Sequence, residues 1–329
     1  MRISPRGEAM INRRETLSLL GTTVMIATAT PQVAPAQDFP DKRLSIVVGF
    51  GAGGMTDVTS RMLGRHMEKA LGVTVIIENK PGVGGTLAIN SAGQLPADGH
   101  TLVSFPAEVP FTNAYHGKPF NLDEWAVLGG YMPQERVVFA AKIAPFSTFQ
   151  EMVEYAKKSP VTFGDAGSFW SARVIEAYAK KHGLQIAVVS HRSGQEASMA
   201  IMGGHVMAAE TGTGTPAWAA AKSGELNILA TLTPGGLAAF GMPNVPTLEQ
   251  LGADYIARVF YGYAVRAGTP HDRVEKLRAA FKQAVEDSEV QKQMKAIDLT
   301  PMWIDPTTYE ATLRKVSDDA KNLREYLKK

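Results

Sequence analysis

Short apolar runs alternate with stretches of helical spacing between residues 44 and 105. The run at 44–50, LSIVVGF, is rich in β-branched residues and predicts a buried strand. Apolar positions then recur with helical spacing over 58–71, and Gly72 is expected to end that helix. The runs at 73–78 and 101–105 predict two further strands. Strands that alternate with helices predict a parallel sheet and an α/β fold.

The rest of the chain repeats this alternation in a second part of similar size. The expected strands are 137–141, 161–164, 186–189, 206–210, 228–231 and 259–265. The expected helices between them are 148–158, 173–182, 195–202 and 215–221. Two more helices are expected in the tail, because Thr269-Pro270 and Asp305-Pro306 each join a capping residue to a first-turn proline. The pattern therefore predicts two α/β halves.

Residues 1–36 have the pattern of an export signal. A basic start with Arg13-Arg14 precedes an apolar run at 17–29 and an Ala-Pro-Ala cleavage pattern at 34–36. The apolar run is shorter than the roughly 20 residues needed to span a bilayer. The paired arginines are typical of export in the folded state, and a general secretory signal fits equally well. The mature protein is expected to begin near Gln37 in an exported compartment.

Composition excludes several classes of protein. The chain is 45% hydrophobic and 20% charged, which is ordinary for a folded globular protein. It has no cysteine, so disulfide scaffolds, thiolate catalysis and cysteine-bound metals are excluded. The formal charge is +2 and the segment 1–36 is itself basic, so the remaining chain is close to neutral. Nothing in this balance favours nucleic-acid binding.

Two glycine-rich loops follow the first two expected strands, each just before a helix. Glycines at 51–54 and 82–85 leave backbone N–H groups unobstructed, and a helix start adds unpaired donors. Thr56, Asp57 and Thr86 are expected to cap the two helices. Parallel strands end at one edge of a sheet, so the two loops are predicted to form one anion-binding cradle. The alternative is that each loop only makes a tight strand-to-helix turn.

A dinucleotide-binding site is a second hypothesis. Residues 49–54 match G-x-G-x-x-G after a strand, and Glu78 ends the next strand. Asp57 in the first helical turn opposes a pyrophosphate, and the loop at 81–85 has no part in that motif. An exported oxidoreductase is therefore the weaker interpretation. The seven histidines form no i, i+4 pair, so no metal site is predicted.

With both loops in view, the sequence resembles the Bug-type, TctC-like receptors of tripartite tricarboxylate transporters. The family patterns V-x-F-x-A-G-G-x-x-D, E-N-[KR]-P-G-x-G-G and P-x-D-G-[YH]-T-L match residues 48–57, 78–85 and 96–102. Weaker matches follow in order at 163–167, 203–206, 223–226, 243–247, 261–262 and 267–270. The resemblance covers essentially the whole chain after the signal.

The resemblance implies a periplasmic receptor with the two-lobe, type II binding-protein fold, each lobe a mostly parallel sheet flanked by helices. Lobe 1 is expected at 37–136 and 261–329, and lobe 2 at 137–260. A small carboxylate would lie between the lobes and be held by backbone N–H groups, with Phe50 beneath it. The residues that this implies are Phe50, Gly53, Gly54, Thr56, Asp57, Gly82, Val83, Gly84, Gly85 and Thr86.

The second lobe departs from the family pattern. Small residues and a histidine are usual where Ser168, Phe169, Trp170 and Arg173 stand, and Glu210 stands where the family often has Asp. With His191 and Tyr261, these residues complete the predicted site. An aromatic ligand could stack on Phe169 and Trp170, unless both rings belong to the lobe core. A second carboxylate would pair with Arg173, Arg192 or His191.

The resemblance also predicts the partners. They are a small organic acid, aromatic or dicarboxylic, and the membrane permease subunits of a tripartite tricarboxylate-type transporter. The receptor is expected to be a monomer that binds no nucleic acid, has no cofactor or metal and carries out no catalysis. A ligand-sensing periplasmic partner of a signalling protein remains the alternative function.

Overall fold

The computed structural model describes residues 38–329 apart from 119, 167–168 and 258, together with the backbone alone of Phe169. The described chain from Asp38 forms one compact unit. The predicted export signal at 1–36 and Ser168 lie outside the described residues.

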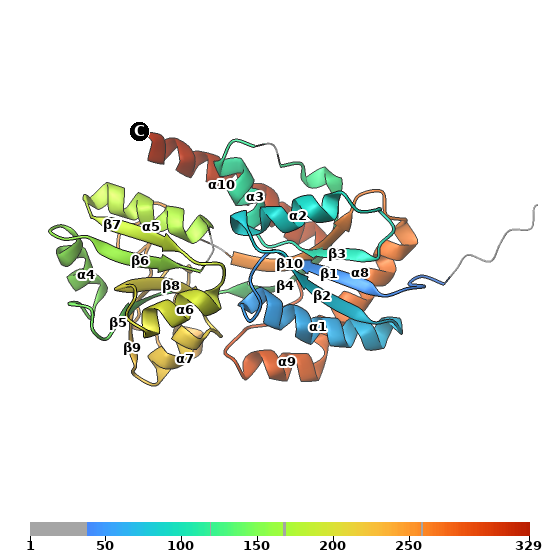
Figure 1. Cartoon of the computed structure of the whole chain (residues 1–329), viewed down its shortest axis with the longest axis horizontal. Helices are drawn as coiled ribbons and strands as arrows, with labels where there is room; N and C mark the ends of the chain where they lie inside the picture. The colour runs from blue at the N-terminus through green and yellow to red at the C-terminus, as the bar shows by residue number, and fades with distance from the viewer. Residues whose placement is uncertain (1–37, 119, 167–168, 258) are drawn as a thin grey trace, which may run out of the picture. The chain divides into compact units, whose positions relative to one another are not determined.

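The first sheet has the strand order β2-β1-β3-β10-β4. Its strands are β1 (Leu44–Val48), β2 (Val75–Asn79), β3 (Thr101–Ser104), β4 (Trp125–Gln134) and β10 (Val259–Arg266). Its helices are α1 (Met55–Leu71), α2 (Thr86–Gly93), α3 (Glu108–Tyr115), α8 (His271–Glu286), α9 (Ser288–Lys295) and α10 (Pro306–Lys328). We call this sheet with its helices the first lobe (Figure 1).

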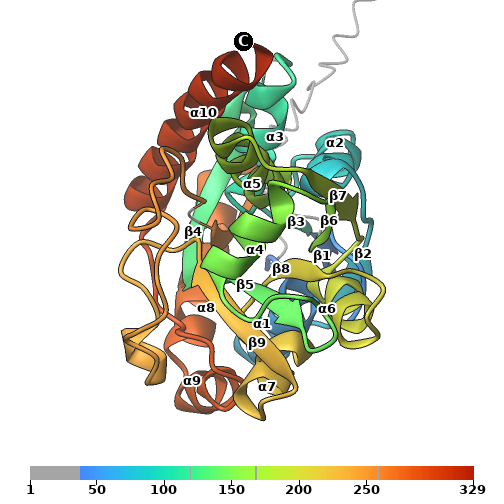
Figure 2. The ribbon, with the colours of Figure 1, turned by 90° about the vertical axis from the view of Figure 1, so that its left-hand side faces the viewer.

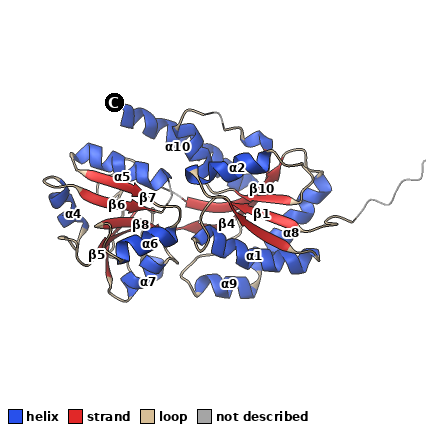
Figure 3. Ribbon diagram, viewed as in Figure 1, coloured by secondary structure: helices blue, strands red, loops and turns tan. Residues whose placement is uncertain are grey.

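The second sheet has the order β7-β6-β8-β5-β9. Its strands are β5 (Arg136–Ala141), β6 (Val161–Asp165), β7 (Ile186–Ser190), β8 (Ala208–Gly212) and β9 (Leu226–Thr231). Its helices are α4 (Phe149–Ala156), α5 (Phe169–His182), α6 (Gly194–Met202) and α7 (Pro216–Lys222). This sheet with its helices is the second lobe, and helices flank both sheets (Figure 3).

Each sheet is mixed. Strands β1 and β6 pair in parallel with both neighbours, whereas β10 and β5 are antiparallel to both of theirs. The sheets are thus less parallel than the alternation of strands and helices indicates. The reason is that β4 runs directly into β5, and β10 enters the first sheet from the second lobe. The fold class, two α/β lobes, is confirmed; the predicted lobe boundaries remain a prediction.

Buried helix faces hold the elements against the sheets. Leu63 and Met67 of α1 are fully buried, and Gly64 lets the helix approach Val75 and Ile77 of β2 closely. Helix α10 packs against β4, α3 and, across the lobes, α5; Figure 2 shows it along one side of the molecule. Asp305 caps α10 by accepting from the Thr308 N–H, as the Asp-Pro signal predicts.

Some local predictions are wrong. Thr56 and Asp57 are not caps, because α1 begins at Met55 and Gly54 occupies the N-cap without a side-chain bond. Thr86 is likewise the first residue of α2, and Gly85 is its N-cap. Three elements, α3, β4 and α9, have no counterpart among the predicted ones.

Candidate functional site

The first glycine-rich loop is fixed by a buried carboxylate in the first turn of α1, the helix that follows it. Asp57 is 3% exposed, and its Oδ2 accepts the Gly53 N–H at 3.0 Å. Arg61, one helical turn on, binds the same carboxylate through Nε at 3.1 Å and Nη2 at 2.8 Å. Burial acts to raise the pKa of Asp57, but the hydrogen bonds from Arg61 and Gly53 outweigh it and lower the pKa. Asp57 therefore holds the loop in its conformation, and the positive charge of Arg61 compensates its negative charge.

We expect Asp57→Asn to destabilise the protein by about 1–2 kcal/mol at pH 7, because a charge-assisted bond becomes a neutral one. The folded-state pKa of Asp57 lies below its ordinary value of 3.8, so this stability is present above that pH and is lost as the pH falls through the folded pKa. Urea unfolding of both proteins at pH 7 and pH 3 measures the difference. A gap that stays constant between the two pH values contradicts the assignment.

The second glycine-rich loop turns through four consecutive left-handed or glycine-only conformations. Gly82, Val83, Gly84 and Gly85 have φ of 146°, 49°, 57° and 89°. Val83 is thus a non-glycine residue in a strained region, and its side chain is 63% exposed. The Gly85 N–H donates back to the Gly82 carbonyl at 3.1 Å, so this turn is closed by its own backbone.

The two loops touch. A Cβ on Gly49 would lie 2.5 Å from the Cα of Gly85, so the two backbones are in direct contact. A Cβ on Gly85 would lie 3.5 Å from the ring of Phe50, which is 9% exposed. Phe50 therefore packs under the second loop, and both loops border the same region of the structure.

Residues of the second lobe lie on the opposite side of this region. The Gly51 N–H donates to the Arg192 carbonyl at 3.2 Å, and a Cβ on Gly54 would lie 3.0 Å from that of Ser193. A cavity of about 410 Å³ opens between the second loop and the end of β7, and Asp165 also lines it. Asp165 is 1% exposed and accepts the Ser190 hydroxyl at 2.6 Å.

A smaller cavity of about 20 Å³ lies deeper between the lobes, enough for one water molecule. The residues lining it are Phe50, Gly54, Met55, Thr56, Glu108, Gln134, Arg136, Ala166, Ser193, Gly194, Thr215 and Tyr261. We call the two cavities together the cleft. The carboxyl ends of parallel strands form its walls, where open α/β sheets bind ligands.

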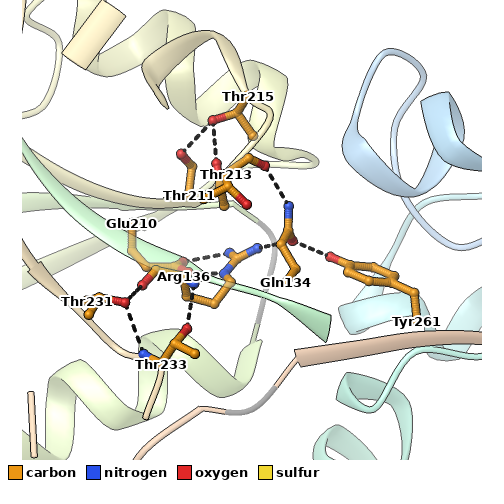
Figure 4. A network of polar contacts seen from close by, with 10 residues as sticks. Gln134, Arg136, Glu210, Thr211, Thr213, Thr215, Thr231, Thr233 and Tyr261 are labelled. Atoms are coloured by element: carbon orange, nitrogen blue, oxygen red, sulfur yellow. Dashed lines mark hydrogen bonds and ion pairs between the residues drawn. The ribbon is translucent and has the colours of Figure 1, made fainter. Parts of the chain in front are cut away.

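A polar network forms the floor of the cleft, at the crossing from β4 to β5 (Figure 4). The Tyr261 hydroxyl donates to Gln134 Oε1 at 2.7 Å, and Gln134 Nε2 donates to the Thr213 carbonyl at 3.1 Å. Arg136 Nη1 donates to the same Gln134 oxygen at 3.2 Å. Its Nε and Nη2 bind Glu210, the second at 2.8 Å. Tyr261 and Gln134 thus join the two strands that pass between the lobes.

The structure brings part of the predicted site together. Residues lining the cleft are Phe50, Gly54, Thr56, Gly82, Val83, Gly84, His191 and Tyr261. Gly53, Asp57 and Gly85 lie within the two loops behind that surface. The Thr86 hydroxyl accepts from Asn113 Nδ2, and Glu210 lies behind Arg136.

Two of the aromatic and basic candidates lie elsewhere. Trp170 is 2% exposed and stacks on Phe111 with ring centroids 4.9 Å apart. It lines a separate cavity beside α10. Arg173 pairs with Glu176 on its own helix. The side chain of Phe169 is outside the described residues.

The sequence analysis did not predict seven cleft residues with polar side chains. Glu108, Gln134, Arg136, Ser193 and Thr215 line the deep cavity, and Asp165 and Ser190 line the larger one. Glu108 opens α3 and Gln134 ends β4, two elements that were not predicted. The only available signal was an arginine beside a strongly apolar run at 137–141, which is unusual for a buried strand.

Asp298 joins the lobes at a second place. Its Oδ2 accepts Trp218 Nε1 at 2.8 Å and Lys222 Nζ at 2.7 Å, both from α7 of the second lobe. Asp298 follows α9 of the first lobe and has a left-handed φ of 56°. Trp218 is 1% exposed, so its indole N–H depends on this carboxylate while the lobes are in contact.

We expect Asp298→Ala to speed ligand release. While the lobes are in contact, the variant leaves the buried indole N–H of Trp218 without its acceptor. The cost of about 1–3 kcal/mol corresponds to an affinity lower by about 5- to 150-fold. Stopped-flow Trp fluorescence measures the release rate. Asp318→Ala is the control, since it removes only an exposed pair with Lys321 on α10. Equal release rates in both variants would refute a role for Asp298 in holding the lobes.

Among the described residues, no three His, Asp or Glu side chains are grouped to hold a metal ion. Within the same part of the chain, every helix is too short or too polar to cross a membrane.

Solved structures share this fold. Rpa4515 of R. palustris with adipate, at 18% identity and TM-score 0.79, covers 88% of this chain and 99% of that one. MatC (Rpa3494) of Rhodopseudomonas palustris with bound malate, at 21% identity and TM-score 0.77, covers 87% and 100%. The protein therefore has the two-lobe α/β fold of these structures.

Sequence comparison identifies the family. The model of the tripartite tricarboxylate transporter family receptor, TctC, matches residues 59–327. A protein of Cupriavidus necator, described as the UPF0065 protein in gbd 5'region, is 33% identical over 296 residues, which are 88% of each chain. The chain belongs to the tripartite tricarboxylate transporter receptor family, as the resemblance predicted.

Proposed function

We propose that this protein captures a small carboxylate in the cleft and presents it to the permease subunits of a tripartite tricarboxylate-type transporter in the periplasm. One carboxylate group of the ligand binds backbone N–H groups of the second loop at 82–84 and of the first turn of α1, since the Gly51, Gly53 and Gly54 N–H groups already donate within the protein. The observation that carries the proposal is the direct contact of Gly49, after β1, with Gly85 of the second loop, beside a cavity that Ser190, His191 and Arg192 of the second lobe also line.

The energetics support this kind of ligand. Removing a carboxylate from water costs several kcal/mol. Three or four charge-assisted N–H bonds, at about 1.5–3 kcal/mol each, offset that cost. Micromolar binding needs about −8 kcal/mol in total, so the body of the ligand has to contribute through burial and hydrogen bonds. Phe50 and Tyr261 supply buried aromatic surface in the cleft. The structurally similar proteins that hold adipate and malate have ligands of this chemical class.

Thermal-shift screening of the purified protein against aliphatic and aromatic acids, followed by calorimetric titration of those that stabilise it, tests the proposal. We expect at least one carboxylate to bind with micromolar affinity, and the same compound with every carboxylate converted to a methyl ester or primary amide to bind far more weakly. If these fully blocked compounds bind as well as their acids, the anion cradle is disproved.

A further inference from the structure

The deep end of the cleft contains an ion pair that is almost completely buried. Arg136 is 4% exposed, and Glu210 on the neighbouring strand β8 is fully buried. The pair is bidentate, because Nε and Nη2 of the guanidinium bind separate oxygens of the carboxylate. Arg136 lines the deep cavity, whereas Glu210 lies behind it.

Other contacts keep Arg136 in this arrangement. Gln134 Oε1 accepts both Arg136 Nη1 and the Tyr261 hydroxyl, and Gln134 is itself held by the Thr213 carbonyl. The backbone N–H of Arg136 donates to the Thr233 hydroxyl at 2.9 Å. Figure 4 shows Glu210 and Gln134 bound to the guanidinium, with Tyr261 bound to Gln134. A rotamer change that turned Arg136 toward a ligand would break the three side-chain bonds to Glu210 and Gln134.

Arg136 remains a cation, and its charge is compensated. Burial acts to lower the pKa of Arg136, but the attraction and hydrogen bonds of Glu210 outweigh it and raise the pKa. Of the five N–H groups of the guanidinium, three donate to Glu210 and Gln134. The other two N–H groups can still donate hydrogen bonds, but Glu210 balances the positive charge of the guanidinium.

Besides Tyr261, the other ionisable group lining this cavity is an acid, Glu108, which is 1% exposed. The Glu108 carboxyl acts to raise the pKa values of Arg136, Tyr261 and Tyr309. Among the described residues lining that cavity, Arg136 is the one cation, and Glu210 already neutralises it. A second ligand carboxylate placed here would lose its hydration and meet no uncompensated positive charge.

We infer that the Arg136–Glu210 pair makes the cleft select monocarboxylates whose far end is uncharged and forms hydrogen bonds, and reject dicarboxylates of the same length. The inference rests on the proposed function and narrows its ligand class. The second loop and the start of α1 take the single carboxylate. Arg136 and Tyr261 line a cavity with room for one water molecule, and through such a water they offer hydrogen bonds to a neutral amide, carbonyl or hydroxyl at the other end.

The test uses ligands that differ only in the charge of the far end. Adipate, its monoamide and 6-aminohexanoate form one set. Succinate, its monoamide and 4-aminobutyrate form a second, and terephthalate with its monoamide a third. In calorimetric titrations, wild type is expected to bind the monoamide at least tenfold tighter than the dicarboxylate in each set that binds. Glu210→Gln leaves Arg136 as an uncompensated cation and is expected to reverse this order by tenfold or more.

The double variant Arg136→Gln/Glu210→Gln provides the matched control. It also lacks Glu210 but has no cation, so it is expected not to gain dicarboxylate affinity. Circular dichroism and thermal unfolding establish that each variant is folded. If Glu210→Gln does not fold, the wild-type order of affinities and the double variant still test the inference.

The possible outcomes distinguish failure of this inference from failure of the proposed function. A wild-type preference for the dicarboxylate or for the cationic ligand overturns the inference while leaving the proposed function intact. So does a folded Glu210→Gln variant with unchanged selectivity, or a double variant that gains dicarboxylate binding. Failure of every acid in the panel to bind wild type or any variant refutes the proposed function itself.

Discussion

Gly54→Asp is expected to abolish carboxylate binding and leave the protein folded. Gly54 lines the deep cavity at the start of α1, where a Cβ would lie 3.0 Å from the Ser193 Cβ and from the Gly51 carbonyl oxygen. The new carboxylate would repel the ligand's own. Two like charges about 4 Å apart repel by about 4 kcal/mol in a partly screened site, which corresponds to roughly a thousandfold loss of affinity.

Gly54→Asn separates charge from size, because Asn has nearly the volume of Asp without its charge. We expect Asn at this position to weaken binding through steric contact with Ser193, and Asp to weaken it much further. Calorimetric titration gives both affinities, and thermal unfolding shows whether the fold is kept. Equal affinities for the two variants would mean that the ligand's charge lies away from this loop. Retained wild-type affinity in Gly54→Asp would place the anion elsewhere altogether.

The first lobe could be predicted well because its signals are local. The strand at 44–50 and its glycine loop are adjacent in sequence, and Gly82, Gly84 and Gly85 occupy conformations that other residues rarely adopt. Even there, the capping roles of Thr56 and Asp57 were wrong. Asp57 bonds backward to Gly53 and forward to Arg61, which the capping pattern does not distinguish from a cap.

The floor of the cleft could not be predicted, because it is made of contacts between distant segments. Arg136 and Glu210 are separated by 74 positions, and Gln134 and Tyr261 by 127. Strand β4 itself, WAVLGGYMPQ, has glycines and a proline that weaken its strand pattern. Trp170 illustrates the opposite error. Its type and position suit a binding platform, but it stacks on Phe111 away from the cleft cavities.

Removing one partner of the buried Arg136–Glu210 pair is expected to be among the most destabilising changes in this chain. Arg136→Met leaves the fully buried Glu210 carboxylate without its cation, and we expect the free energy of unfolding to fall by about 3–5 kcal/mol. Urea unfolding followed by circular dichroism measures it. Lys321→Met, which breaks an exposed pair with Asp318, is the control and is expected to cost well under 1 kcal/mol.

Arg136→Met/Glu210→Met distinguishes a stabilising role of the pair from a role in ligand selection. Replacing both charges by apolar side chains of similar volume often restores stability, because neither charge then has to be taken out of water. We expect the double variant to recover most of the loss, with a strong coupling between the two positions. Such recovery would mean that the pair is not needed for folding, and that its effect lies in the charge it sets at the deep end of the cleft. A double variant as unstable as Arg136→Met would instead show that the pair is a structural requirement of the crossing between the lobes.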